Sequence, residues 1–319
     1  MPDSQSWSAW ASKAREQSHD LTSSSVSECD SVPTGIEPAT GGTGATMTNG
    51  SSMMKPAVAL VTGATRGAGK GIAIGLASAG KTVYVTGRSA TESTATLKGK
   101  ILPGTLEETV NAINAAGGTA IGIICDHNDD AQTKTVINQI EAEQGRLDIL
   151  VNNASLIHEN LIDPGGFWEK PLELGNILDV GLRSAYVASY YAAPLMIKNQ
   201  SGLITFTSSF GSVCYMHGPA YGAQKAGVDK FAADMAIDLE NENVAAISLW
   251  LGPQLTERTD VVLKHHPEQY EGFMAMAETP EFNGRIIHAL ACDAKLMERS
   301  GQTLITAELA VEYGIRDAN

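Results

Sequence analysis

Three polar residues in one stretch of the chain have the types and spacing of an acid–base site. Ser208 precedes Tyr221 by thirteen residues, and Lys225 follows Tyr221 by four, a spacing that places the last two on one helix face. An ammonium about 4–6 Å from a phenol favours the phenolate, lowering a tyrosine pKa that starts near 10 by roughly 1–3 units. Such a tyrosine can exchange a proton with a substrate oxygen that a neighbouring hydroxyl holds. This chemistry interconverts a carbonyl and an alcohol, with the hydride supplied by a cofactor because no side chain donates one.

Two neighbouring residues compete for these roles. Ser209 is the adjacent alternative to Ser208, but the thirteen-residue spacing and a glycine that follows favour Ser208. Tyr215 is a second phenol, yet a proline rather than a lysine stands four residues after it. The expected catalytic residues are therefore Ser208, Tyr221 and Lys225.

A regular succession of strands and helices is expected to position these groups. Apolar, strand-like runs occur at 57–62, 82–86, 119–125, 148–152, 203–207, 245–250 and 302–306. Helix-like segments separate most of them, near 69–79, 105–116, 129–144, 173–198, 221–240 and 283–291. This alternation predicts an α/β fold of βαβ units, with a parallel sheet covered by helices on both faces. Ligands of such sheets bind at the carboxyl ends of the strands, where Gly63, Arg88, Asp126, Asn153, Ser208 and Gly252 all fall.

A glycine-rich turn after the first strand is expected to bind a phosphate. Glycines at 63, 67 and 69 permit a tight turn and a close approach of the backbone to a ligand. The helix that follows then offers free N–H donors and the positive end of its dipole. A dinucleotide is therefore the expected cofactor.

The residues after the second strand indicate which dinucleotide is preferred. An NAD site usually has an acidic residue about 20 positions past the glycine turn, but residues 81–91 contain neither Asp nor Glu. Arg88 stands there instead, and Arg66 lies within the glycine turn. Two guanidiniums can clamp a 2′-phosphate, so we expect NADP(H) rather than NAD(H).

These motifs together resemble those of the short-chain dehydrogenase/reductases. The resemblance covers residues 56 to about 318 and includes the TGxxxGxG turn, Val151-Asn152-Asn153-Ala154, the serine, tyrosine and lysine set, and Gly252 with Thr256. Within the family the chain is most similar to the group around dehydrogenase/reductase family member 1, notably in DVGLRSAY at 179–186 and LAVEYGIRD at 309–317.

The resemblance implies a Rossmann-type, doubly wound fold and an oxidoreductase activity. It implies one catalytic domain over 56–319, with a seven-stranded sheet in the order 3-2-1-4-5-6-7 and a substrate-binding loop at about 253–280. It also implies hydride transfer between NADP(H) and a carbonyl or secondary alcohol, in a homodimer or homotetramer. The cofactor-binding residues it implies are Gly63, Thr65, Arg66, Gly67, Ala68, Gly69, Lys70, Arg88, Asp126, Asn153, Ala154, Tyr221, Lys225, Gly252 and Thr256.

Three departures from the family pattern bear on the nicotinamide end of this site. Gly181 replaces an asparagine that many members use to hold a water linked to the lysine, although its backbone carbonyl remains. The usual Pro-Gly reads Gly252-Pro253, and Gln254 stands where a small apolar residue is common. These changes leave open an alternative, a catalytically impaired NADP-binding protein that acts through protein interactions.

The remaining sequence limits the other classes of function. Residues 1–55 are rich in Ser, Thr and Gly, and are expected to be a disordered tail or the result of a misplaced start, with initiation at Met47, Met53 or Met54. A net charge of −14 disfavours nucleic acid as a partner. The sequence contains no run of 18 apolar residues, so no membrane-spanning helix is expected. The cysteines and histidines lack the spacing of a metal site. Four scattered cysteines favour reduced thiols and a cytoplasmic location.

Overall fold

A parallel sheet with helices on both faces forms the body of the protein. The computed structural model describes residues 56–318 except 266, 267, 269–271 and 273. Within that part of the chain, seven parallel strands form one sheet in the order β5-β2-β1-β6-β7-β8-β9. Their bounds are β1 Val58–Val61, β2 Thr82–Gly87, β5 Thr119–Ile124, β6 Ile149–Asn152, β7 Gly202–Ser208, β8 Val244–Trp250 and β9 Thr303–Ile305. The predicted fold class and strand order are confirmed.

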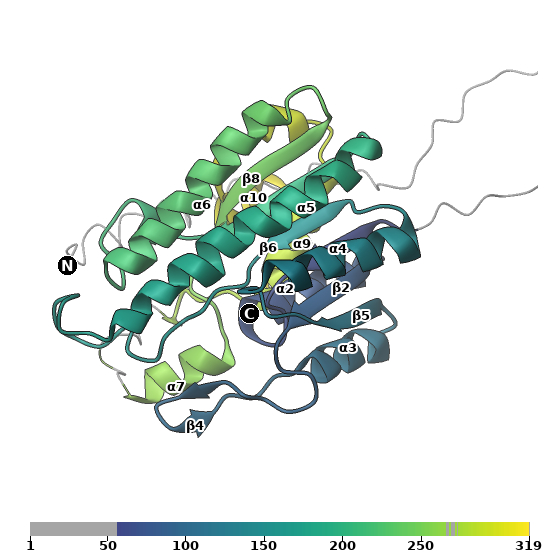
Figure 1. Ribbon diagram of the computed structural model, residues 1–319. Helices are drawn as coiled ribbons and strands as arrows, with labels where there is room; N and C mark the ends of the chain where they lie inside the picture. Colours follow the sequence, from purple (N-terminus) through teal and green to yellow (C-terminus); the bar gives the residue numbers. More distant parts are fainter. Residues whose placement is uncertain (1–55, 266–267, 269–271, 273, 319) are drawn as a thin grey trace, which may run out of the picture.

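Two layers of helices cover the sheet, one on each face (Figure 1). One layer holds α4 (Asp130–Gln144), α5 (Ser184–Lys198) and α6 (Pro219–Asp238). The other holds α2 (Gly67–Ser78), α3 (Leu106–Ala115), α9 (Pro280–Ala291) and α10 (Thr306–Glu312). Successive side chains of a strand point to opposite faces, so Val58 and Leu60 pack against the first layer, and Ala59 and Val61 against the second. Each face of the sheet therefore has its own apolar core. Because the strands are parallel, their carboxyl ends lie at the same edge of the sheet.

Three regions differ from the predicted elements. The segment 89–105, for which no strand was predicted, contains a short hairpin of β3 (Thr96–Leu97) and β4 (Lys100–Ile101). The first part of the loop at 253–280 forms α7 (Glu257–His265). A helix that was not predicted, α10, follows the last strand. Each of these elements is short, and periodicity over so few residues is a weak signal.

The helix predicted over 173–198 is interrupted, and the prediction of one continuous helix is wrong. The segment forms a 3₁₀ turn, η1 (Leu172–Ile177), then a wide turn, η2 (Leu178–Arg183), before α5 begins. Gly181 lies within η2 with φ of 147°, which is outside helical geometry and favours glycine. The amide of Gly181 donates to the Ser184 hydroxyl at 3.0 Å, and its carbonyl accepts from Gln224 at 2.9 Å. These bonds hold the break in the helix.

Some expectations fall on residues that lie outside the described part. They are the tail at 1–55 and part of the substrate-binding loop expected at about 253–280. Across the described helices, none has the length and apolar character required to cross a bilayer.

Candidate active site

One cavity at the carboxyl ends of the strands contains nearly all the residues predicted to bind ligands. Its volume is about 810 Å³, and it extends from the glycine turn to Tyr221 and Lys225. Of the predicted site residues, Lys70 does not line it. An elongated cavity between a phosphate-binding turn and an acid–base pair has the outline that a dinucleotide requires.

The acid–base end of the cavity is built on the first turns of α6. This helix begins at Pro219, whose fixed φ and missing N–H suit a first helical position. Tyr221 therefore points back from the helix start over the end of β7, and its hydroxyl lies 2.9 Å from the hydroxyl of Ser209. The Lys225 ammonium lies 5.4 Å from the centre of the Tyr221 ring and donates to the Thr207 carbonyl at 3.0 Å. The predicted tyrosine and lysine are thus brought together.

The structure brings Ser209, rather than Ser208, to the phenol. Ser208 is the last residue of β7, paired with Trp250, and its buried hydroxyl donates to the Lys225 carbonyl at 3.3 Å. Ser209 follows the strand and its side chain turns to the opposite side, where it also accepts from the Gly211 amide at 3.2 Å. Both serines line the cavity. The geometry favours Ser209 for the contact with Tyr221 that was expected of Ser208.

Burial has the largest effect on the pKa values at this end of the cavity, and it shifts the Tyr221 pKa in the direction opposite to that expected from the sequence. It raises the pKa of Tyr221, and the hydrogen bond with Ser209 opposes this only in part. It also lowers the pKa of Lys225 to about 8, an effect that Asp229 opposes. The expected depression of the Tyr221 pKa by Lys225 is therefore not what the structure shows. The physical reason is that the phenol itself is buried, and burial disfavours its charged form.

At the opposite end, the glycine turn is packed so closely that larger residues would not fit. A Cβ on Gly69 would lie 2.4 Å from the amide nitrogen of Asn153 and 2.5 Å from the Gly63 carbonyl oxygen. Gly67 has φ of 57°, a left-handed conformation that favours glycine. The Asn153 amide itself donates to the carbonyls of Thr62 and Gly63, at 2.8 and 3.1 Å. This cradle of backbone and glycine fits the phosphates of a dinucleotide.

The two arginines expected to clamp a 2′-phosphate are not equally available. The Arg66 guanidinium donates to the Pro103 and Gly104 carbonyls, at 2.8 and 2.6 Å, and to the Ser93 hydroxyl at 2.9 Å. It therefore anchors the segment that carries the β3–β4 hairpin. Arg88 is exposed at the end of β2 and lines the cavity. Of the two arginines, Arg88 is thus the one that is exposed on the cavity wall.

Residues at the start of α7 also line the phosphate end, although sequence reasoning had not singled them out. The Glu257 carboxylate accepts from the Gly67 amide at 3.0 Å. Beside it, Arg258 donates to the Ile157 carbonyl at 3.3 Å, and burial lowers the pKa of its guanidinium. The only sequence signal was their position directly after the predicted Thr256, which places them within the same loop.

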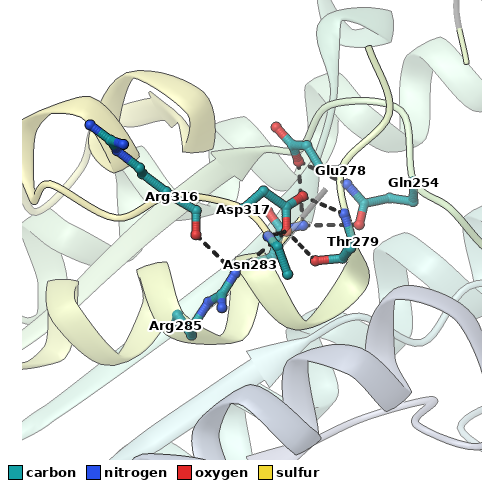
Figure 2. Close-up of polar contacts among 8 residues, drawn as sticks. Gln254, Glu278, Thr279, Asn283, Arg285, Arg316 and Asp317 are labelled. Carbon is teal, nitrogen blue, oxygen red and sulfur yellow. Dashed lines mark hydrogen bonds and ion pairs between the residues drawn. The ribbon is translucent and has the colours of Figure 1, made fainter. Parts of the chain in front are cut away.

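A short segment after β8 spans the distance between the two ends. It begins at Gly252 and reaches Thr256, whose methyl group lies 3.6 Å from where a Cβ on Gly67 would stand. Glu278, which sequence reasoning also missed, holds this segment in place: its amide donates to the Pro253 carbonyl at 2.7 Å, and its carbonyl accepts from the Leu255 amide at 2.9 Å. Figure 2 shows the Glu278 side chain among Gln254, Asn283 and other polar groups at the start of α9. Glu278 belongs to no recognisable sequence motif, so its place in the site is seen only in the structure.

Comparisons with known proteins agree with this geometry. The family model for short chain dehydrogenases matches residues 57–266. The chain is 37% identical over 281 residues to human "Dehydrogenase/reductase SDR family member 1", which covers 83% of this chain and 84% of that protein. This similarity confirms the predicted resemblance to that group. The chain is also 29% identical over 212 residues to the 3-oxoacyl-[acyl-carrier-protein] reductase FabG of Staphylococcus aureus, covering 66% of this chain and 80% of that protein.

A solved structure shares the fold over most of the described residues. It is provisionally assigned as an NAD(P)-dependent gluconate 5-dehydrogenase from Beutenbergia cavernae, and it contains NADP at low occupancy. Its TM-score is 0.64 at 26% sequence identity, covering 78% of this chain and 94% of that one.

Proposed function

The chain belongs to the short-chain dehydrogenase/reductase family, and on that premise we propose that it transfers a hydride between NADP(H) and a carbonyl or secondary alcohol. The observation that carries this proposal is the hydrogen bond of 2.9 Å between Ser209 and Tyr221, beside Lys225 and within the cavity of the glycine turn. A bound nicotinamide would supply the hydride, which no side chain can.

In this proposal the side chains manage the proton and the charge on the substrate oxygen. Tyr221 gives its proton to the oxygen during reduction and accepts it back during oxidation. Ser209 donates a hydrogen bond to the same oxygen and stabilises its developing charge. Lys225 binds the ribose next to the nicotinamide and helps return the proton to Tyr221. Because burial raises the pKa of Tyr221, the phenol is well suited to act as the acid in carbonyl reduction.

We further propose a preference for NADP(H). Support comes from Arg88, which is exposed on the cavity wall at the end of β2, where no carboxylate stands within residues 81–91. A guanidinium there favours a phosphate on the ribose, whereas an acid would repel it.

The test is turnover by the purified full chain with NADPH, against a panel of ketones, aldehydes and quinones. The proposal predicts oxidation of NADPH with at least one carbonyl, and slower oxidation of NADH. Dinucleotide binding without turnover across the panel would contradict the proposal and favour the alternative, a binding protein that has lost catalysis. Failure to bind either dinucleotide would contradict both.

A homo-oligomer located in the cytoplasm is also proposed. Tyr186 and Tyr190 stack on the outer surface of α5 and are 49% and 62% exposed, and Tyr186 contacts Phe231 of α6. Exposed aromatic residues on two neighbouring helices suit an interface between identical subunits. Size measurement in solution tests this, and a monomer at micromolar concentration would contradict it.

A further inference from the structure

A buried carboxyl group, that of Glu278, lies against the segment between the two ends of the cavity. We propose that Glu278 discriminates between the two redox states of the cofactor, favouring the oxidised form with its cationic ring over the reduced form with its neutral ring. This inference rests on the proposed function, because it assumes that the cavity holds a nicotinamide dinucleotide. It adds a residue and a charge preference that the family motifs do not contain.

The position of the segment 252–256 ties Glu278 to the nicotinamide end. The Leu251 amide, just before the segment, donates to the Ser208 carbonyl at 3.2 Å, next to the serine that contacts Tyr221. At the other end of the segment, Thr256 lies against Gly67 of the phosphate turn. A molecule with its phosphates at the glycine turn and its reactive ring beside Tyr221 must therefore pass along this segment.

The Glu278 carboxyl group is held with one oxygen bound and the other turned to the backbone of this segment. Its Oε2 accepts from the Gln254 side chain at 2.9 Å, the Gly252 amide at 3.3 Å and Asn283 at 3.4 Å (Figure 2). Its Oε1 accepts no hydrogen bond from the described residues and lies 2.7 Å from where a Cβ on Gly252 would stand. Glu278 is 9% exposed and lines the cavity. A side chain at position 252 would therefore displace the carboxyl group of Glu278.

The Gln254 side chain is fully used in holding this arrangement. Its nitrogen donates to the Gly252 carbonyl at 3.0 Å as well as to Glu278, and its oxygen accepts from Asn283 at 2.9 Å. Gln254, which stands where many family members have a small apolar residue, is therefore a hydrogen-bond partner of Glu278. Both belong to one cluster behind the nicotinamide end.

The ionisation of Glu278 is poised to respond to a charge in the cavity. Burial raises its pKa to about 7, the bonds from Gln254, Asn283 and Gly252 oppose this, and Asp317 of the C-terminal segment adds to the rise. Asp317 accepts from the Thr279 amide at 2.6 Å and pairs with Arg285 of α9 at 3.4 Å. A cation brought into the same cavity favours the carboxylate. By linkage, the carboxylate favours that cation by the same factor.

The experiment compares the affinities of the full chain for NADP⁺ and NADPH, by titration calorimetry at about pH 6 and about pH 8. If NADP⁺ binds mainly the ionised form, the ratio of its Kd to that of NADPH falls by up to about tenfold over this range. Tyr221 and Lys225 also titrate in the cavity, so the ratio is measured again in Glu278→Gln, where we expect a much smaller change. Glu281→Gln, the same substitution in the first turn of α9, should behave as the wild type.

A second measurement needs no variant and can still overturn the inference if Glu278→Gln fails to fold. Calorimetry of the wild type at neutral pH, in buffers of different ionisation enthalpy, counts the protons exchanged on binding. We expect NADP⁺ to release more protons than NADPH. Equal proton release, or a Kd ratio that responds to pH equally in wild type and Glu278→Gln, would overturn the inference while leaving the proposed function intact. Failure of the wild type to bind either dinucleotide would overturn both.

Discussion

The two ends of the cavity are built by different means. At the phosphate end, backbone groups and three glycines within seven residues form the site, and a Cβ on Gly69 would meet atoms at 2.4 and 2.5 Å. At the nicotinamide end, side chains from β7, α6, the segment after β8 and the start of α9 converge, with Glu278 buried among them. The first end depends on local shape. The second depends on charge and on contacts between distant segments.

After the loss expected at Tyr221, the comparison predicts a large effect on turnover at the nicotinamide end, at Ser209. Removing a donor that stabilises a developing oxyanion typically costs about 10²–10³ in turnover. We therefore expect Ser209→Ala to lower kcat by about 10²-fold. The matched variant Ser208→Ala, whose hydroxyl binds the Lys225 carbonyl, should lose less than about tenfold. Steady-state kinetics with NADPH distinguish the two, and the opposite ranking would restore the role expected for Ser208.

At the phosphate end, Arg88→Asp should change which dinucleotide is used. The substitution removes a charge-assisted contact and adds repulsion, each worth about 1.5 kcal/mol or more. We expect the ratio of kcat/KM for NADPH to that for NADH to fall by about 10²-fold. Arg316→Asp, at an arginine that does not line the cavity, is the control. An unchanged ratio in Arg88→Asp would show that the phosphate is recognised elsewhere, with Arg66 and Arg258 the next residues to test.

The packing of the glycine turn makes a prediction about stability and binding together. Gly69→Ala should destabilise the fold by about 1–3 kcal/mol, because the methyl group forces the Asn153 amide and the turn apart. It should also weaken binding of both dinucleotides alike. Gly175→Ala is the control, since nothing lies within 4 Å of a Cβ there. Chemical denaturation measures the stability and titration measures the affinity. Wild-type values of both in Gly69→Ala would contradict the close packing of the turn.

A further effect expected at the nicotinamide end is a pH dependence of stability at Glu278. Burial raises its pKa from 4.5 to about 7, so the folded protein holds a proton that the unfolded chain releases between these values. The stabilisation is fully present below about pH 4.5 and is lost as the pH rises through about 7, on the order of 2–3 kcal/mol. The variant Glu278→Gln should not lose stability in this way, because its amide does not titrate.

Two histidines whose pKa values are lowered make a difference measurement necessary. Burial lowers the pKa of both His127 and His217 to about 4, so their contribution to stability is lost as the pH falls below about 6.5, the opposite sense. Denaturation of wild type and Glu278→Gln in parallel, between about pH 5 and pH 8, cancels this term. The stability of the variant relative to wild type should rise with pH. A constant difference would show that Glu278 does not titrate in this range.

The two ends of the cavity also differ in how much of each could be predicted from the sequence. The strands and the glycine turn were predicted because each is a continuous run whose pattern reflects burial or backbone geometry. The Glu278 cluster could not be predicted, because Gly252 and Glu278 are 26 residues apart and Thr279 and Asp317 are 38 apart. No spacing rule connects side chains that only the packing of α9 brings together. The same holds for Arg66, whose partners Ser93, Pro103 and Gly104 flank a short hairpin with no strong sequence pattern.

The serine shows a finer limit of sequence reasoning. Counting residues to Tyr221 favoured Ser208, but which side a side chain faces depends on where β7 ends. Ser208 is still paired with Trp250, and Ser209 is the first residue beyond the strand. Because side chains alternate along a strand, a shift of one residue exchanges the two hydroxyls.

The most direct test of the proposed acid–base site is hydride transfer by Tyr221→Phe. Deuterium transfer from labelled NADPH to a carbonyl substrate would be followed by mass spectrometry, with NADPH binding measured in parallel and Tyr215→Phe, at an exposed phenol, as the control. We predict that Tyr221→Phe binds NADPH within about threefold of the wild type and transfers deuterium about 10³-fold more slowly. Transfer by Tyr221→Phe at the rate of the wild type would contradict the assignment of Tyr221 as the proton donor.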